Sequence, residues 1–163
     1  FVDKSLQDKA APYKLTLLRL VKYVYIAYGF ALALLNRVII DKRFDVVEAW
    51  RYGPVIPSVY HSFKHNQNEP IKHKASILIN EDENGNMTFI TPMIEDKEIM
   101  QVLDFVWDKY KNRSTSDLID ILHSKGTPWH YCYKEGCNIE IPDEMTKLYY
   151  RSIVVNALKN DTK

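Results

Sequence analysis

Three histidines near the middle of the chain have a spacing that can bind zinc. His61 and His65 lie four residues apart in a segment that we predict to be helical, so both imidazoles would share one helix face, and His73 follows in a loop. The zinc metalloprotease pattern places a glutamate general base after the first histidine, but residue 62 is serine. A metal-dependent hydrolase is kept only as an alternative, because polar residues on a solvent-facing helix and loop show the same pattern.

The second set of candidate metal ligands contains both cysteines of the chain. It comprises His123, His130, Cys132 and Cys137. Its spacing matches no common zinc knuckle and includes no Cys-x-x-Cys pair, so we expect neither a metal nor a cofactor. Two cysteines also give at most one disulfide, which is too few for a secreted disulfide framework, so we expect reduced thiols and a cytoplasmic protein.

The common enzyme signatures are missing from the sequence. There is no Gly-x-Ser-x-Gly elbow, and with 5 glycines the chain has neither a Gly-x-Gly-x-x-Gly loop nor a Walker-type loop to bind phosphate. Catalytic sites can also be assembled from distant residues, but no pattern here indicates one. We therefore predict that the protein is not an enzyme.

A cluster of aromatic residues and one arginine on a segment rich in turn formers is the strongest functional candidate. Trp, Tyr and Arg dominate the hot spots of protein interfaces, because each combines a large contact area with a polar group. The alternative is that Trp50 and Tyr52 only fill the core beside Gly29, and the residues alone leave both interpretations open. The cluster consists of Trp50, Arg51, Tyr52, Gly53, Pro54, Val55, Pro57 and Tyr60.

The composition is that of one globular domain with balanced charge. The 163 residues include 22 Lys+Arg and 21 Asp+Glu, for a net charge of +1, and 46% are hydrophobic. This balance argues against nucleic acid as a partner, although the loop between Lys64 and Lys74 is mildly basic. We treat residues 1–163 as a single domain with a core at about 14–158 and a polar tail at 159–163.

The longest uncharged run favours a buried helix over a membrane span. Its apolar part covers 13 residues, Tyr23–Leu35, and the run is bounded by Arg19 and Lys22 on one side and Arg37 on the other. A bilayer needs about 20 apolar residues, so we expect no membrane segment. A secretory signal is also not expected, because no basic region and cleavage site accompany the run.

Hydrophobic periodicity predicts a mainly α fold, a compact bundle of five to six helices with one small β-hairpin. Residues 14–35 form the central helix, and Gly29 within it indicates the close approach of another segment. Asn84-Gly85 marks the hairpin turn, and Thr127-Pro128-Trp129 interrupts the chain. The hairpin strands are predicted at 76–80 and 87–91. Four further helices are predicted to start at Pro57, after Pro92, at Ser114 and near Pro142. The last of these is predicted to end before Lys159.

The same cluster resembles the Panacea antitoxin domain, the phage-associated SocA/GepA-like family. The family pattern is a Lys- and Leu-rich first helix ending in Tyr-x-x-x-Gly, followed by Glu-Ala-Trp-x-x-Gly-Pro-Val-x-Pro-x-Val-Tyr. Residues Leu20–Ala33 and Glu48–Tyr60 carry both halves in this order, and weaker similarity continues through Gly126–Trp129 and Ile141–Glu144. The departures are the basic spacing in the first helix and Thr127, where a smaller residue is common.

The resemblance implies a helical protein that neutralises a cognate protein toxin by direct contact, the toxin being encoded by an adjacent gene. It also implies a role for a cellular protease, because at least one family member is described as an adaptor that delivers its toxin for degradation. The motif can also serve only as scaffold, in which case the residues that select the partner lie on the hairpin tip, the loop 64–74 or the last helix. We favour a scaffold role for Trp50, Gly53 and Pro54. For Arg51 and Tyr52, both a scaffold role and a contact role stay open. A DNA-binding regulator of its own operon is the second alternative. The toxin and the oligomeric state are not specified by the sequence.

Overall fold

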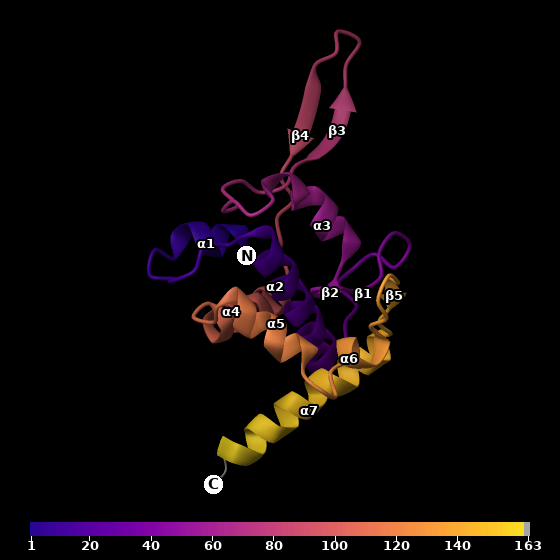
Figure 1. Ribbon diagram of the computed structural model, residues 1–163. Helices are drawn as coiled ribbons and strands as arrows, with labels where there is room; N and C mark the ends of the chain where they lie inside the picture. The colour runs from indigo at the N-terminus through magenta and orange to yellow at the C-terminus, as the bar shows by residue number, and fades with distance from the viewer. Residues whose placement is uncertain (162–163) are drawn as a thin grey trace.

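The apolar stripe predicted over residues 14–35 forms the central helix of the protein (Figure 1). The computed structural model describes residues 1–161, and in it α2 spans Leu17–Phe30 and continues directly into the π-helical segment Ala31–Leu35. Nearly all of α2 is buried, because α4, α5 and α7 pack around it. The core therefore surrounds this helix, as the periodicity predicted.

The described residues contain seven α-helices, so the prediction of five to six was wrong. The two short helices α1 and α6 were not predicted. Thr127-Pro128 does not interrupt the chain but starts α6, with Thr127 as N-cap and Pro128 in the first turn. Besides α2, the helices are α1 (Val2–Gln7), α3 (Pro57–Phe63), α4 (Lys97–Tyr110), α5 (Thr115–His123), α6 (Pro128–Cys132) and α7 (Asp143–Asp161), with a 3₁₀ turn at Lys64–Asn66.

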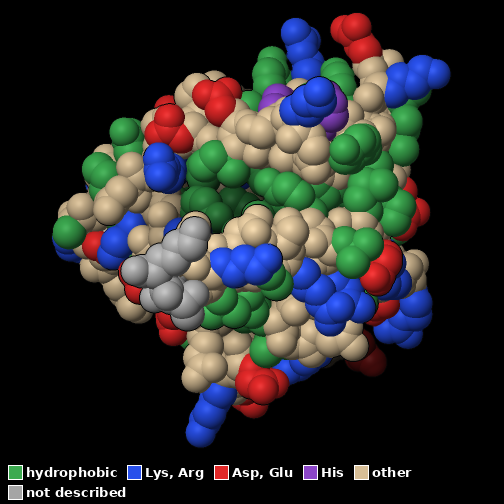
Figure 2. Space-filling model, turned by 90° about the horizontal axis from the view of Figure 1, so that it is seen from below, with side chains coloured by type: hydrophobic (Ala, Val, Ile, Leu, Met, Phe, Trp, Pro, Cys, Tyr) green, Lys and Arg blue, Asp and Glu red, His purple; other side chains and the backbone are tan. Residues whose placement is uncertain are grey.

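The last helix is longer than predicted, and its burial decreases toward its C-terminal end. It runs through Lys159 to Asp161, where we had placed a polar tail, and residues 162–163 lie outside the described part of the chain. Thr146 and Tyr150 are buried, whereas Leu148 and Val155 are about half exposed. Figure 2, which views the molecule from the side on which α7 lies, shows hydrophobic side chains gathered across the centre of this face.

The close approach predicted at Gly29 is confirmed, and the approaching segment is α7. A Cβ atom on Gly29 would overlap the ring of Tyr150. That ring is almost fully buried and makes edge-to-face contacts with Tyr25 and Phe30. Glycine is therefore needed here for helix packing, since any larger residue would separate α2 from α7.

Two small antiparallel sheets are present, whereas one hairpin was predicted. The predicted hairpin exists as β3 (Ile77–Glu81) and β4 (Met87–Ile90), and it projects from the body with every strand residue exposed (Figure 1). The second sheet has the order β2-β1-β5, and its strands β1 and β2 contain part of the predicted aromatic and arginine cluster. Its strands are β1 (Glu48–Trp50), β2 (Gly53–Val55) and β5 (Ile139–Glu140).

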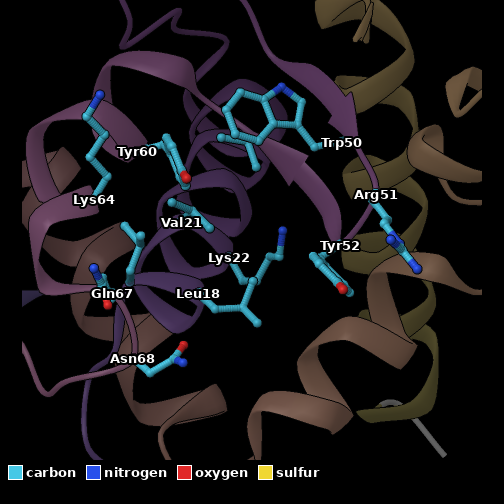
Figure 3. A pocket seen from close by; sticks show the side chains of 12 residues that line it. Leu18, Val21, Lys22, Trp50, Arg51, Tyr52, Tyr60, Lys64, Gln67 and Asn68 are labelled. Atoms are coloured by element: carbon cyan, nitrogen blue, oxygen red, sulfur yellow. The ribbon is translucent and has the colours of Figure 1, made fainter. Parts of the chain in front are cut away.

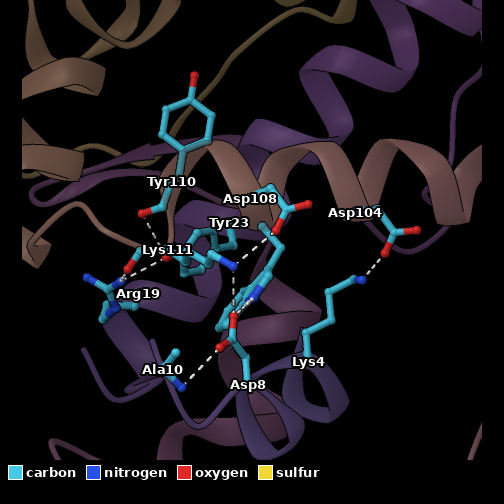
Figure 4. A network of polar contacts seen from close by, with 10 residues as sticks. Lys4, Asp8, Ala10, Arg19, Tyr23, Asp104, Asp108, Tyr110 and Lys111 are labelled. Carbon is cyan, nitrogen blue, oxygen red and sulfur yellow. Dashed lines mark hydrogen bonds and ion pairs between the residues drawn. The ribbon is translucent and has the colours of Figure 1, made fainter. Parts of the chain in front are cut away.

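A polar network fixes α2 and the N-terminal segment to the end of α4 (Figure 4). The buried Arg19 guanidinium donates to the Arg113 carbonyl at 2.7 Å and to the Tyr23 hydroxyl at 2.8 Å. Asp8 accepts from the Trp107 indole and from Lys111, each at 3.0 Å, and these bonds lower the pKa of its carboxyl. The basic residue at position 19 is therefore a structural feature of the first helix.

The N-cap of α6 gives a stability prediction. The buried Thr127 hydroxyl donates to the Leu122 carbonyl at 2.8 Å and accepts from the His130 amide at 3.2 Å, which joins α5 to α6. Thr127→Val keeps the shape but removes both bonds, so we expect the free energy of unfolding to fall by about 1–2 kcal/mol. Urea denaturation measures this change in the free energy of unfolding. Thr127→Ser is the control and keeps most of the stability; a valine variant as stable as the wild type would contradict the assignment.

One helical stretch of the described chain, Leu17–Leu35, is long and apolar enough to cross a membrane by length and composition alone. Within the fold, 78% of its apolar window is buried. Arg19 and Lys22 on this stretch are also buried, and Arg19 donates to the carbonyl of Arg113, in the segment just after α4. The stretch is the core helix of this domain.

Candidate functional site

The predicted cluster surrounds the tight connection between β1 and β2. Trp50 pairs with Gly53, so only Arg51 and Tyr52 lie in the turn. Gly53 has a φ of 107°, a left-handed conformation that favours glycine. Arg51 and Tyr52 are exposed, with the guanidinium 5.5 Å from the centre of the tyrosine ring. The turn thus presents these two side chains outward while the strands stay fixed.

A cavity of about 410 Å³ opens between this turn, α2 and the end of α3 (Figure 3). This volume lies in the range of ordinary ligand pockets. Its walls are mainly apolar, and its polar groups come from the turn, from α2 and from the segment after α3. The lining residues are Leu17, Leu18, Val21, Lys22, Trp50, Arg51, Tyr52, Val55, Tyr60, Lys64, Gln67 and Asn68.

Trp50 is held in place by packing and by two hydrogen bonds. Its ring meets Tyr60 edge to face at 4.8 Å, and its indole N–H donates to Glu48 at 2.6 Å. Its carbonyl accepts from the indole of Trp129 at 2.7 Å. Trp129 in turn stacks on His123 with the ring centres 3.6 Å apart. The strand end that carries Trp50 is therefore rigidly connected to α5 and α6.

Lys22 lies at the inner end of the cavity, directed between Trp50 and Tyr52 (Figure 3). It is fully buried, and its ammonium donates to the Pro54 carbonyl at 3.2 Å. None of the ion pairs among the described residues includes Lys22. Because burial disfavours the charged form, it lowers the pKa of the Lys22 ammonium to about 7. An unpaired buried lysine is unusual and costs stability.

A second polar group close to Lys22 also lacks a partner. Nε2 of His123 is buried and makes no hydrogen bond with the described residues. A methyl group on Gly53 would lie 3.0 Å from the Lys22 ammonium and 3.3 Å from this nitrogen, so both groups lie under the Gly53 backbone. Burial, and then the neighbouring Lys22, lower the pKa of His123. The ring also makes a hydrogen bond to the Tyr52 backbone, so in the neutral form Nε2 is an acceptor without a donor. The one acceptor bonded to the Lys22 ammonium is the Pro54 carbonyl.

The predicted site residues divide into a buried and an exposed group. Gly53, Pro54 and Val55 are buried, and Pro57 begins α3, so these residues shape the bend. Trp50 and Tyr60 form cavity wall, while Arg51 and Tyr52 are accessible. Their role in binding stays a prediction. The sequence analysis did not assign Lys22 or Lys64 to this site, although both line the cavity, nor His123, whose Nε2 lies beneath Gly53. The available signal was the single lysine within an apolar helix.

The two histidine sets considered as metal sites are not assembled. His61, His65 and His73 are exposed on α3 and the following loop, and His130 is exposed on α6, away from the stacked His123. The described part of the chain holds no group of three His, Cys, Asp or Glu side chains placed to bind an ion. The hydrolase alternative depended on histidines that converge in one site, and the described residues do not form such a site.

Comparison with known proteins gives two sequence matches. Residues 20–130, which include most of α2, the β1–β2 turn and the start of α6, match the family described as antitoxin SocA-like, Panacea domain. Over 130 residues, 78% of this chain, the sequence is 32% identical to Antitoxin SocA of Caulobacter vibrioides (strain NA1000 / CB15N), and the match spans 66% of that relative's length. No solved structure matches the chain.

Proposed function

The chain belongs to the antitoxin SocA-like family with the Panacea domain, and from that premise we propose that it neutralises a cognate protein toxin in the cytoplasm by binding it directly. The supporting observation is the rigid β1–β2 turn, which presents the exposed Arg51 and Tyr52 beside an apolar cavity. Exposed aromatic and arginine side chains at the edge of a preformed hollow are typical of interface anchors. The partner is expected from an adjacent gene.

Co-purification tests the binding step. The tagged chain is expressed together with the untagged product of the adjacent gene, and a one-step purification is analysed by size-exclusion chromatography with light scattering. We expect a stoichiometric complex, whose mass also gives the oligomeric state. Separate elution of the two proteins at micromolar concentration would contradict direct binding.

Arg51 and Trp50 are expected to affect binding in different ways. Arg51→Ala removes an exposed anchor and should weaken the complex by about ten-fold or more, with the free energy of unfolding unchanged. Trp50→Ala removes the packing against Tyr60 and should lower that free energy by about 3 kcal/mol. Titration calorimetry and thermal denaturation separate the two effects. Arg113→Ala, which removes an exposed arginine side chain just after α4, is the control; equal binding by Arg51→Ala and Arg113→Ala would remove Arg51 from the interface.

Masking and delivery to a protease both begin with this complex, and the partner's lifetime distinguishes them. If the chain only masks its partner, the half-life of the partner in the cell stays the same or increases, because the bound surface is protected from proteases. An adaptor shortens the half-life, and the shortening disappears in a host that lacks the protease. Pulse-labelling of the partner with and without the chain measures this directly.

A further inference from the structure

The cavity beside the β1–β2 turn carries an excess of positive charge. Its described lining residues include Lys22, Arg51 and Lys64 but no aspartate or glutamate. The whole chain has a net charge of only +1, so this local excess is not a general property of the surface. The rest of the wall is largely apolar, with Leu17, Leu18 and Val55 among its members. A complementary ligand is therefore apolar and carries a negative group.

The inner end of the cavity lacks a counter-charge. An ammonium has three N–H donors, and Lys22 uses one on the Pro54 carbonyl. The neighbouring His123 supplies no negative charge, because its pKa is lowered and its imidazole is neutral or cationic. Buried polar groups are normally satisfied, and a buried charge is normally paired. An unpaired lysine retained at this depth, facing a cavity, indicates that its partner is supplied by another molecule.

We propose that this cavity binds a carboxylate carried on an apolar segment of the partner protein, with Lys22 as its inner counter-ion and Arg51 at its rim. The inference rests on the proposed function, because it specifies which chemical group of the bound partner enters the cavity. The apolar walls would bury the segment's side chains, and the amides of Gln67 and Asn68 line the same space. Lys22 has no exposed surface in this structure, so binding would require the neighbouring Tyr52 side chain, which lies beside it in Figure 3, to move aside.

A carboxylate probe tests the chemistry without the partner. The ¹⁵N-labelled full chain is titrated with 4-methylpentanoate and, in parallel, with the uncharged isostere 4-methylpentanamide. We expect the Trp50 indole and Gly53 amide signals to shift with an affinity at least five-fold tighter for the acid. The Trp107 indole, which is bonded to Asp8 and does not line the cavity, is the internal control, and its signal should not move. Lys22→Met should abolish the difference; equal shifts with acid and amide would overturn the proposal.

The partner complex tests the role of the site. Lys22→Met and Arg51→Glu should each weaken the complex at least ten-fold, whereas Lys125→Glu, exposed on the loop between α5 and α6, should not. Selection for partner variants that bind Arg51→Glu should yield an acidic residue changed to lysine. If truncation or amidation of the partner's C-terminus has the same effect as the loss of Lys22, the carboxylate is the chain terminus; otherwise it is an Asp or Glu side chain.

The outcomes separate this inference from the proposed function. A partner that binds wild type and Lys22→Met equally well overturns the carboxylate site but leaves direct binding standing. A wild-type chain that binds no partner, yet still prefers the acid through Lys22, overturns the proposed function while the site stands. Circular dichroism of each variant shows whether the change in binding has a structural cause.

Discussion

Lys22→Met is expected to make the protein more stable at pH 7, by about 1–4 kcal/mol. The ammonium is buried and makes one hydrogen bond, to a carbonyl, so its removal from water is poorly compensated. Methionine has a similar length and fills the same space without a charge, and such replacements of buried ions are often neutral or stabilising. Chemical denaturation measures the difference. Lys64→Met, on the exposed side of the same cavity, is the matched control and should change stability little.

The pH dependence of stability gives a second readout of the same residue. Burial holds the pKa of Lys22 at about 7 in the folded chain, against the ordinary value of 10.5 when the chain is unfolded. Between these values the unfolded state binds the extra proton, so the free energy of unfolding rises with pH, by about 2 kcal/mol from pH 7 to pH 9. Because other titrating groups are common to both proteins, the wild type minus Lys22→Met difference isolates this contribution.

Either of two results would contradict this account of Lys22. The methionine variant could be less stable than the wild type at every pH, which would make the bond to Pro54 a structural requirement. The two proteins could also show parallel stability curves from pH 7 to pH 9, which would mean that Lys22 keeps an ordinary pKa. A stabilising substitution that abolishes binding would instead identify a residue kept for function at the expense of stability.

Gly29→Ala is expected to destabilise the protein by about 2–3 kcal/mol. In an exposed helix this change stabilises by about 1 kcal/mol, so the sign of the effect is itself diagnostic. Here the new Cβ would overlap the Tyr150 ring, which is packed against Tyr25 and Phe30 and has no space to withdraw. Thermal and urea denaturation both report the loss.

A double-mutant cycle assigns the Gly29 effect to Tyr150. Tyr150→Leu alone leaves a cavity and should cost about 2–4 kcal/mol, since the ring is almost fully buried. In Gly29→Ala/Tyr150→Leu the new methyl group occupies part of that space, so the combined loss should be at least about 1 kcal/mol smaller than the two single losses added together. Strict additivity would show that the contact between α2 and α7 is not the cause.

The central helix and the bend after it could be predicted because their signals are local. Apolar residues repeat with helical spacing over 14–35, and Gly29 within that stripe required a close neighbour, although the identity of the neighbour, Tyr150, needed the fold. Pro57 marked the start of α3 in the same way. Short elements were missed because their start signals resemble turns, as at Thr127-Pro128, where an N-cap and a first-turn proline begin α6.

The inner part of the candidate site could not be predicted, because it forms only when distant segments meet. Lys22 marked the charged boundary of an apolar run, and charged residues usually lie at the surface. It is buried because the β1–β2 turn folds over α2 and α5 brings His123 beneath Gly53. The 13-residue apolar run alone contains no information about that turn. The burial of Lys22 is therefore a tertiary property.

Colony formation during expression of the adjacent gene's product tests the central claim most directly. The product is induced alone, with the wild-type chain, and with the chain carrying Arg51→Glu, at protein levels matched by immunoblot. We predict that the product alone arrests growth, that the wild-type chain restores colony numbers to those of the uninduced strain, and that Arg51→Glu fails to do so although it is folded. Persisting arrest with the wild-type chain present in molar excess would contradict an antitoxin role for this protein.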